Sequence, residues 1–172
     1  MNSAASRETQ EEEFPIVRPL PSNITPLEVF RVLAGDRYPI FFDSAMPHPT
    51  LGRYSFLAAD PFDWIEMPAK GTAPLDQLAQ ALLPYRTSRR ADLPPFQGGA
   101  AGLLGYELAQ SLENIPSARH DEFKLPALAV GLYDVVVAFD HLQQQGWIIS
   151  QGLPEQTSAA RRQRAIARAE QV

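Results

Sequence analysis

The clearest strand signal in the sequence is ALAVGLYDVVVAFD, at residues 127–140, where β-branched and aromatic residues dominate. A polar turn follows at 141–146, and the apolar run at 147–150 is placed to pair back as the second strand of a hairpin. Asp134 interrupts this apolar stretch, so we expect it to lie at a kink or to face a polar partner. Strands joined by short connections favour an α+β fold, with a largely antiparallel sheet and flanking helices.

Further strands are expected before this hairpin. The run YPIFFD at 38–43 is predicted to be a buried strand, and RYSFLAA at 53–59 alternates in polarity as a half-buried strand does. Asp60 and Pro61 end the second run, and residues 62–67 are expected to return as its hairpin partner.

The most unusual stretch is PFQGGAAGLLGY at 95–106, with four glycines within eight residues. Gln97 stands where a dinucleotide-binding loop needs its first glycine, and no lysine follows as in a phosphate-binding loop. We therefore predict a strand whose missing side chains permit a bend or the close approach of another backbone. Leu103, Leu104 and Tyr106 are expected to anchor this strand in a core.

Helices are predicted at 26–34, 74–83, 107–115 and 155–172. The first has the clearest ends, because Thr25 and Glu28 form a capping box around Pro26 and Gly35 is a natural stop. The last is rich in Arg and Ala and is expected to be exposed, with a thin apolar stripe of Ala and Ile166. The apolar face of the first helix is expected to contain Leu27, Phe30, Val32 and Leu33.

Composition limits the classes of function. A net charge of −5 and a pI of about 5.2 argue against a nucleic-acid surface. The sequence contains no cysteine, which excludes disulfides and thiolate zinc sites. The polar, acidic start does not fit a secretory signal, and no apolar run reaches the roughly 18 residues that span a membrane. We therefore expect a soluble, cytoplasmic protein of one domain.

Residues suited to catalysis are sparse. His48, His120 and His141 stand alone in predicted loops, so we expect surface or turn residues and no metal site. Ser44 follows Asp43 at a strand end, but no base is paired with it in the sequence, which disfavours a hydrolase. The residues alone therefore indicate a scaffold without a catalytic site.

Three segments together resemble a known family. FFDSAMPHPTLGRYSFLAADPF at 41–62, PFQGGAAGLLGYELAQSLENIP at 95–116 and VGLYDVVVAFDH at 130–141 are similar, in order and spacing, to the N-terminal domain of aminodeoxychorismate synthase component I. Anthranilate synthase component I is the sibling alternative. The polar, acidic composition of the start of the chain predicts a disordered arm, set at 1–17. The resemblance implies a domain at 18–155 and a helical linker at 156–172 toward a chorismate-binding domain that this chain lacks.

The family's activity enters as an implication of this resemblance. Component I converts chorismate and ammonia to 4-amino-4-deoxychorismate for folate synthesis, with the ammonia supplied from glutamine by an amidotransferase partner. The sibling makes anthranilate. Both need Mg²⁺, and both hold chorismate and magnesium in the C-terminal domain, so no catalytic residue and no cofactor carries over to this chain.

A tryptophan-like pocket does carry over, at positions matching Ser44, Leu51, Gly52, Arg53 and Tyr54. Ser44 could accept from an α-ammonium group, and the backbone beside Gly52 could approach a ligand closely. The alternative is structural, with Ser44 capping a turn and Arg53 lying at a strand end. Two other functions stay open: a stand-alone module that binds tryptophan or another amino acid, and an interaction domain that contacts an amidotransferase.

Overall fold

The computed structural model describes residues 14–46, 48, 50–68, 73–116, 119–120 and 122–172. Most of the arm predicted to be disordered lies outside these ranges. Its boundary at residue 17 is wrong, because strand β1 already begins at Ile16 and pairs with the C-terminal half of the chain.

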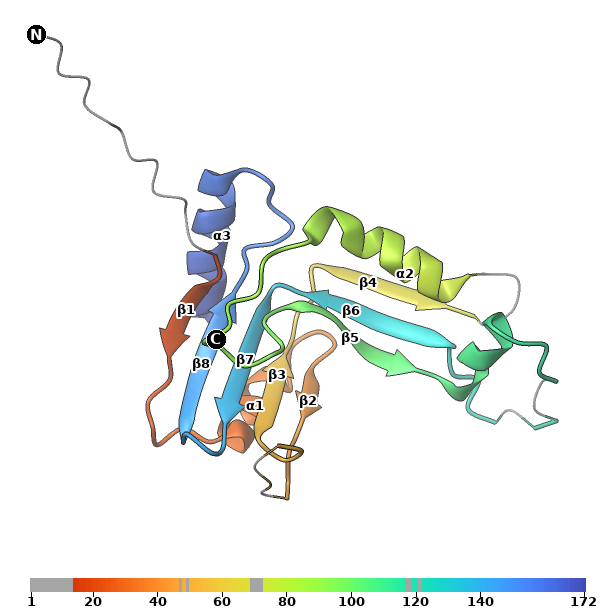
Figure 1. Cartoon of the computed structure of the whole chain (residues 1–172), viewed down its shortest axis with the longest axis horizontal. Coiled ribbons are helices and arrows are strands. Elements are labelled where there is room, and N and C mark those ends of the chain that lie inside the picture. Colours follow the sequence, from red (N-terminus) through yellow and green to blue (C-terminus); the bar gives the residue numbers. More distant parts are fainter. Residues whose placement is uncertain (1–13, 47, 49, 69–72, 117–118, 121) are drawn as a thin grey trace, which may run out of the picture.

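Two antiparallel sheets form the fold, which confirms the α+β prediction (Figure 1). The first sheet has five strands in the order β1-β8-β7-β3-β2. Helices α1 and α3 contact this sheet, α1 at β3 and α3 at β1, β7 and β8. The bounds are β1 Ile16–Pro19, β2 Ile40–Phe42, β3 Tyr54–Ala58, β7 Val135–Asp140, β8 Gln145–Ser150, α1 Pro26–Leu33 and α3 Ser158–Gln171.

The second sheet has three strands in the order β4-β6-β5 and projects away from the first, with α2 running alongside (Figure 1). The predicted hairpin of 53–59 with 62–67 is wrong, because β3 pairs with β2 and β7 whereas β4 pairs with β6. Asp60, in the left-handed region at φ 51°, turns the chain out of one sheet and into the other. The bounds are β4 Asp63–Met67, β5 Gly99–Leu104, β6 Leu128–Tyr133, α2 Pro74–Leu82, and the 3₁₀ turns η1 Leu83–Tyr85 and η2 Tyr106–Ser111.

The run at 127–140 forms two strands, one in each sheet. β6 ends at Tyr133 and β7 begins at Val135, so Asp134 is the single residue between them. All residues of both strands are buried. The expectation of a kink with a polar partner at Asp134 is confirmed, because Arg164 and Arg168 bind its carboxylate. The hairpin of this run with 147–150 is confirmed in the β7–β8 pairing.

Both faces of the five-stranded sheet carry a hydrophobic core. On one face, residues such as Leu57 and Val137 pack with Val29 and Leu33 of α1 and with Ala169 of α3. On the other face, a second cluster unites strands of both sheets and the loop before β5; it contains Ala58, Ala101, Tyr133, Val136, Ala138 and Ile149, with Phe56 and Phe96 against it. The second cluster is the apolar contact between the two sheets.

Helix α1 has the predicted capping box, in which Thr25 and Glu28 bond each other's backbone. Its predicted apolar face is partly wrong, since Val29 and Leu33 are buried whereas Leu27 and Val32 are 50% and 68% exposed. The prediction of a buried strand at 38–43 also fails in part. β2 lies at the sheet edge, and Phe42 is exposed.

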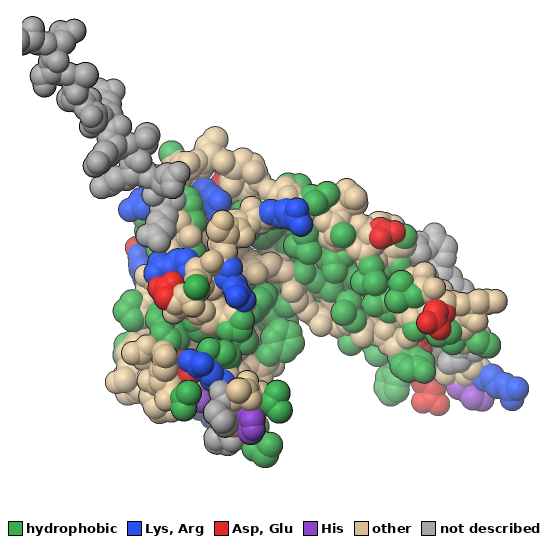
Figure 2. Space-filling model, viewed as in Figure 1, with side chains coloured by type: hydrophobic (Ala, Val, Ile, Leu, Met, Phe, Trp, Pro, Cys, Tyr) green, Lys and Arg blue, Asp and Glu red, His purple; other side chains and the backbone are tan. Residues whose placement is uncertain are grey.

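The glycine-rich stretch forms strand β5, as predicted, and Gly102 permits a close backbone approach. A Cβ at Gly102 would lie 2.2 Å from the Ala129 carbonyl oxygen of β6. The expected core anchors are wrong, because Leu103, Leu104 and Tyr106 are 42%, 57% and 87% exposed. Apolar side chains gather over this projecting part of the molecule (Figure 2). Those exposed in its β5 to β6 region are Leu103, Leu104, Tyr106, Leu112, Phe123 and Leu125.

Helix α3 is less exposed than predicted. Its stripe of Ala165 and Ala169 is buried, and Arg161, Arg164 and Arg168 make contacts with residues before the helix. The C-terminal segment therefore packs on the domain through α3, and its predicted role as a linker stays a prediction.

Candidate ligand-binding site

An open depression of about 480 Å³ lies at the end of β2 and the start of β3. Its volume is within the range of small-molecule sites, and its residue types are mixed as in such sites. Four aromatic side chains, two aliphatic hydroxyl side chains, one carboxylate and Leu51 line it: Phe41, Phe42, Asp43, Ser44, Thr50, Leu51, Tyr54 and Phe56. The combination suits a ligand with a flat apolar part and a charged polar end.

Ser44 is held in place by the neighbouring strand. Its hydroxyl donates to the Tyr54 carbonyl oxygen, and its amide donates to the Ser55 hydroxyl at 3.1 Å. Because the hydroxyl hydrogen is used within the protein, the Ser44 oxygen can face a ligand only as an acceptor. That is the role a ligand ammonium group would need.

Ser55 is a buried polar residue behind the side chains that line the depression. Its side chain is fully buried, and its hydroxyl lies 3.0 Å from Asp43 Oδ1 and 2.7 Å from His141 Nε2. The contacts fix the orientation of Asp43, which supplies the carboxylate of the depression. They do not form a hydrolase triad, because Asp43 bonds the serine and not the histidine.

Gly52 allows the loop before β3 to close on itself. A Cβ at this position would lie 1.9 Å from the Met46 carbonyl oxygen, so any larger residue forces the loop to move. His48 organises the same loop, because its Nδ1 accepts from the amides of Leu51 at 3.0 Å and Thr50 at 3.2 Å. Leu51 is 88% exposed at the rim of the depression.

Arg53 points to β7. Its guanidinium donates twice to Asp140 Oδ2, at 2.6 and 2.9 Å, and lies over the Tyr54 ring at 4.9 Å. Burial would raise the pKa of Asp140, but the bonds from Arg53 and from the amides of Gln143 and Leu142 hold it below its ordinary value. Arg53 therefore joins β3 to the end of β7.

The structure brings three of the five candidate residues to one site. Ser44, Leu51 and Tyr54 line the depression, whereas Gly52 shapes its loop and Arg53 bonds away from it. Sequence reasoning did not connect Ser55 or His141 with the site. Ser55 lies inside the quoted segment 41–62, but its contact with His141 spans 86 residues and no local pattern indicates it.

Two other kinds of feature are absent from the described part of the chain. No group of three or more His, Cys, Asp or Glu side chains there is placed to hold a metal ion. No helix there combines the length and the apolar character needed to cross a membrane.

Comparison with known proteins gives consistent matches. The chain is 36% identical over 118 residues to aminodeoxychorismate synthase component 1 of Salmonella typhimurium, covering 60% of this chain and 26% of that protein. It is 30% identical over 149 residues to anthranilate synthase component 1 of Mycolicibacterium smegmatis, covering 77% of this chain and 28% of that protein. No family model matches.

A solved structure shares the fold. Anthranilate synthase component I of Streptococcus pneumoniae superposes with a TM-score of 0.56 at 22% identity, covering 86% of this chain and 34% of that one. The chain thus spans between 26% and 34% of the length of these three proteins. The chain is therefore similar in sequence to part of component 1 of aminodeoxychorismate synthase and anthranilate synthase, and in fold to part of anthranilate synthase component I.

Proposed function

We propose that this chain is the N-terminal, non-catalytic part of an aminodeoxychorismate synthase component I. The observation that carries the proposal is the 36% identity over 118 residues to the Salmonella protein of that name. In such an enzyme chorismate and ammonia give 4-amino-4-deoxychorismate, with the ammonia supplied by a glutamine amidotransferase subunit. Chorismate and Mg²⁺ would be held by the part of component I outside this chain, in the cytoplasm. Anthranilate synthase component I is the alternative parent enzyme.

The projecting sheet supports this role. The exposed leucines at 103 and 104 of β5, with Tyr106 of η2 and Phe123 in the loop before β6, form the kind of apolar surface that soluble proteins bury in contacts. Since the matched relatives are about three to four times the length of their matching segments, the rest of component I is a natural occupant of this face.

A chimaera tests the proposal. We expect the chain alone, with chorismate, ammonium and Mg²⁺, to give no 4-amino-4-deoxychorismate by chromatography. The Salmonella component 1 carrying this chain in place of its matching segment is expected to turn over, because the catalytic part is retained. The same chimaera with Leu103→Glu and Leu104→Glu, which place one charge on each face of the β5 edge, is expected to lose at least about tenfold of that activity, since at least one charge would be buried.

A variant that adds a charge away from this surface provides the control. Leu142→Glu, at an exposed turn position, should leave the chimaera active. Turnover by the chain alone would contradict a non-catalytic role. A folded chimaera without activity would contradict the assignment to component I.

The depression favours a second function, the binding of an aromatic amino acid such as tryptophan. Its aromatic lining could hold an indole ring, and Asp43 with the Ser44 oxygen could receive the α-ammonium group. The site is open to solvent, so we expect an affinity near 1 mM, or about −4 kcal/mol. The same pocket could serve feedback control in the full enzyme or a stand-alone binding module.

Calorimetry with L-tryptophan tests this function. Ser44→Ala removes the acceptor and is expected to weaken binding about 3- to 10-fold, the effect of one hydrogen bond. Ser88→Ala, at an exposed loop position, is the matched control and should bind as the unmodified chain does. Equal affinity in all three proteins would assign Ser44 a structural role only, and no heat at millimolar tryptophan would remove the binding function.

A further inference from the structure

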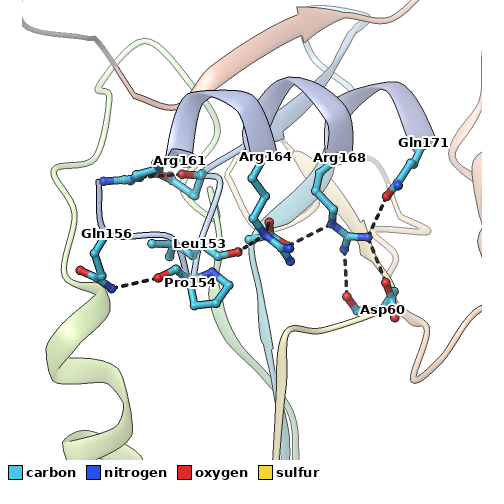
Figure 3. A network of polar contacts seen from close by, with 10 residues as sticks. Asp60, Leu153, Pro154, Gln156, Arg161, Arg164, Arg168 and Gln171 are labelled. Carbon is cyan, nitrogen blue, oxygen red and sulfur yellow. Dashed lines mark hydrogen bonds and ion pairs between the residues drawn. The ribbon is translucent and has the colours of Figure 1, made fainter. Parts of the chain in front are cut away.

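Three arginines on one face of α3 turn toward the domain and not toward solvent (Figure 3). Arg161, Arg164 and Arg168 are spaced three and four residues apart, which places them in a row along the helix. Arg162, by contrast, is exposed. All three cationic side chains bind groups inside the molecule. Their partners show which parts of the chain α3 holds together.

The partners of Arg168 are the two points where the chain passes between the sheets. In the described part of the chain it leaves the five-stranded sheet once, at Asp60 between β3 and β4, and returns once, at Asp134 between β6 and β7. Arg168 donates to Asp60 Oδ2 at 3.0 Å, to the Asp60 carbonyl oxygen at 2.9 Å and to Asp134 Oδ1 at 3.4 Å. One side chain therefore joins both crossings.

The other two arginines extend the same contact. Arg164 lies 3.3 Å from Asp134 Oδ2 and also donates to the Leu153 carbonyl oxygen. Arg161 donates to the Gln151 carbonyl oxygen at 2.8 Å. Gln151 in turn donates through its amide side chain to the Gln97 carbonyl oxygen, just before β5 of the second sheet. All three arginines thus act at the line where the sheets meet.

The central ion pair of this network is shielded from solvent. Asp134 is fully buried and Arg168 is 14% exposed, so their attraction is screened little by water. Burial raises the pKa of Asp134, and the guanidinium groups of Arg168 and Arg164 oppose that shift. Asp60, at 47% exposure, contributes the weaker ion pair of the two.

We propose that α3 is a clamp that sets the angle between the two sheets, with Arg168 as its central contact. Apart from α3, the sheets are joined by the crossing at 59–62, the single-residue crossing at Asp134, the Gln151–Gln97 bond, the contacts of Tyr38 with Tyr133 and Trp64, and the apolar cluster between them. Each crossing can then rotate about its own backbone dihedrals. Arg168 removes that freedom by fixing both crossings to one rigid helix.

The absence of cysteine in the sequence allows a direct distance measurement. Spin labels at Glu66→Cys in β4 and Gln145→Cys in β8 report one exposed position on each sheet. The labelled chain is expected to give one narrow distance distribution. With Arg164→Ala and Arg168→Ala added, we expect a broader or displaced distribution and a Tm lowered by roughly 6–12 °C. Arg162→Ala is the matched control and should change neither.

A milder pair of variants keeps the test decisive if the double variant does not fold. Arg168→Lys retains the charge but loses the planar fork, and Asp60→Asn weakens only the half-exposed crossing. Each is expected to broaden the distance distribution while circular dichroism stays unchanged. A distribution as narrow as that of the unmodified chain, in folded variants with a lowered Tm, would show that α3 stabilises the fold without setting the angle, and would overturn the proposal.

Discussion

Replacing Gly102 by alanine is expected to destabilise the chain by about 2–4 kcal/mol, because the new methyl group has no space. Its Cβ would lie 2.2 Å from the Ala129 carbonyl oxygen and 2.9 Å from Val130 Cα, both backbone atoms of β6. The backbone at Gly102 also has φ 156°, which side chains rarely adopt. Relief requires β5 and β6 to separate where Gly102 faces Val130. Urea unfolding followed by circular dichroism measures the loss.

Gly99→Ala, at the start of the same strand, separates the two causes. Gly99 also has a positive φ, of 117°, but a Cβ there meets nothing within 4 Å. We expect only backbone strain, a loss of about 1 kcal/mol. Equal losses in the two variants would contradict the clash with β6 as the main cause at Gly102.

Replacing Asp134 by alanine is expected to cost about 3–5 kcal/mol, since it leaves two inward-facing arginines without their shared carboxylate. Arg168 keeps its bonds to Asp60, whereas Arg164 loses its ion pair and keeps a bond to the neutral Leu153 carbonyl oxygen. Asp36→Ala, at an exposed position after α1, is the matched control and should stay within about 0.5 kcal/mol of the unmodified chain. A loss that small at Asp134 would contradict a stabilising network.

The difference in the free energy of unfolding between the unmodified chain and Asp134→Asn is expected to change with pH in a definite direction. Burial raises the pKa of Asp134 in the folded chain, with Arg168 and Arg164 opposing. A raised folded-state pKa contributes stability below the ordinary pKa, and that contribution is lost as the pH rises through the raised value. The unmodified chain should therefore gain stability relative to Asp134→Asn as the pH falls from above the raised pKa of Asp134 to below the ordinary aspartate pKa. A difference that shrinks toward low pH would contradict the direction of the shift.

Local sequence patterns predicted where helices and strands form better than they predicted which strands pair. The capping box of Thr25 and Glu28 is contained in four residues, and the helix begins where it indicates. The pairing of β4 is different, because Asp60 and Pro61 fit a hairpin turn as well as a crossing between sheets. The choice depends on β6 and β7, which lie some 70 residues further along the chain and offer each strand a buried partner.

The apolar face of α1 shows a second limit. Positions 27, 29, 30, 32 and 33 are all apolar, so the sequence permits more than one buried side. The sheet below selects Val29 and Leu33, which pack against Leu57 and its neighbours. On β5 the apolar character of Leu103 and Leu104 predicts burial within this chain, whereas both side chains are exposed. The centre of a contact surface is enriched in apolar and aromatic side chains, so an apolar strand by itself does not distinguish a core from such a surface.

The candidate site was predictable only through family resemblance. Ser44, Leu51 and Tyr54 line the depression, and no spacing rule would have selected them from the loop. Ser55 and His141 meet across two paired strands, because the register of β3 with β7 places Tyr54 opposite Asp140. That register depends on the packing of the whole sheet and cannot be predicted from either segment alone.

Because only Asp134 separates β6 from β7, this part of the chain has little room for insertions or deletions. Side chains alternate between the two faces of a strand, so adding or removing one residue beside Asp134 would reverse the facing of the side chains of β6 relative to those of β7. Both strands are buried throughout, and neither could accommodate the reversal. Insertions should be tolerated better in the exposed turn at 142–144 than within 128–140, because the turn side chains face solvent and those of both strands do not.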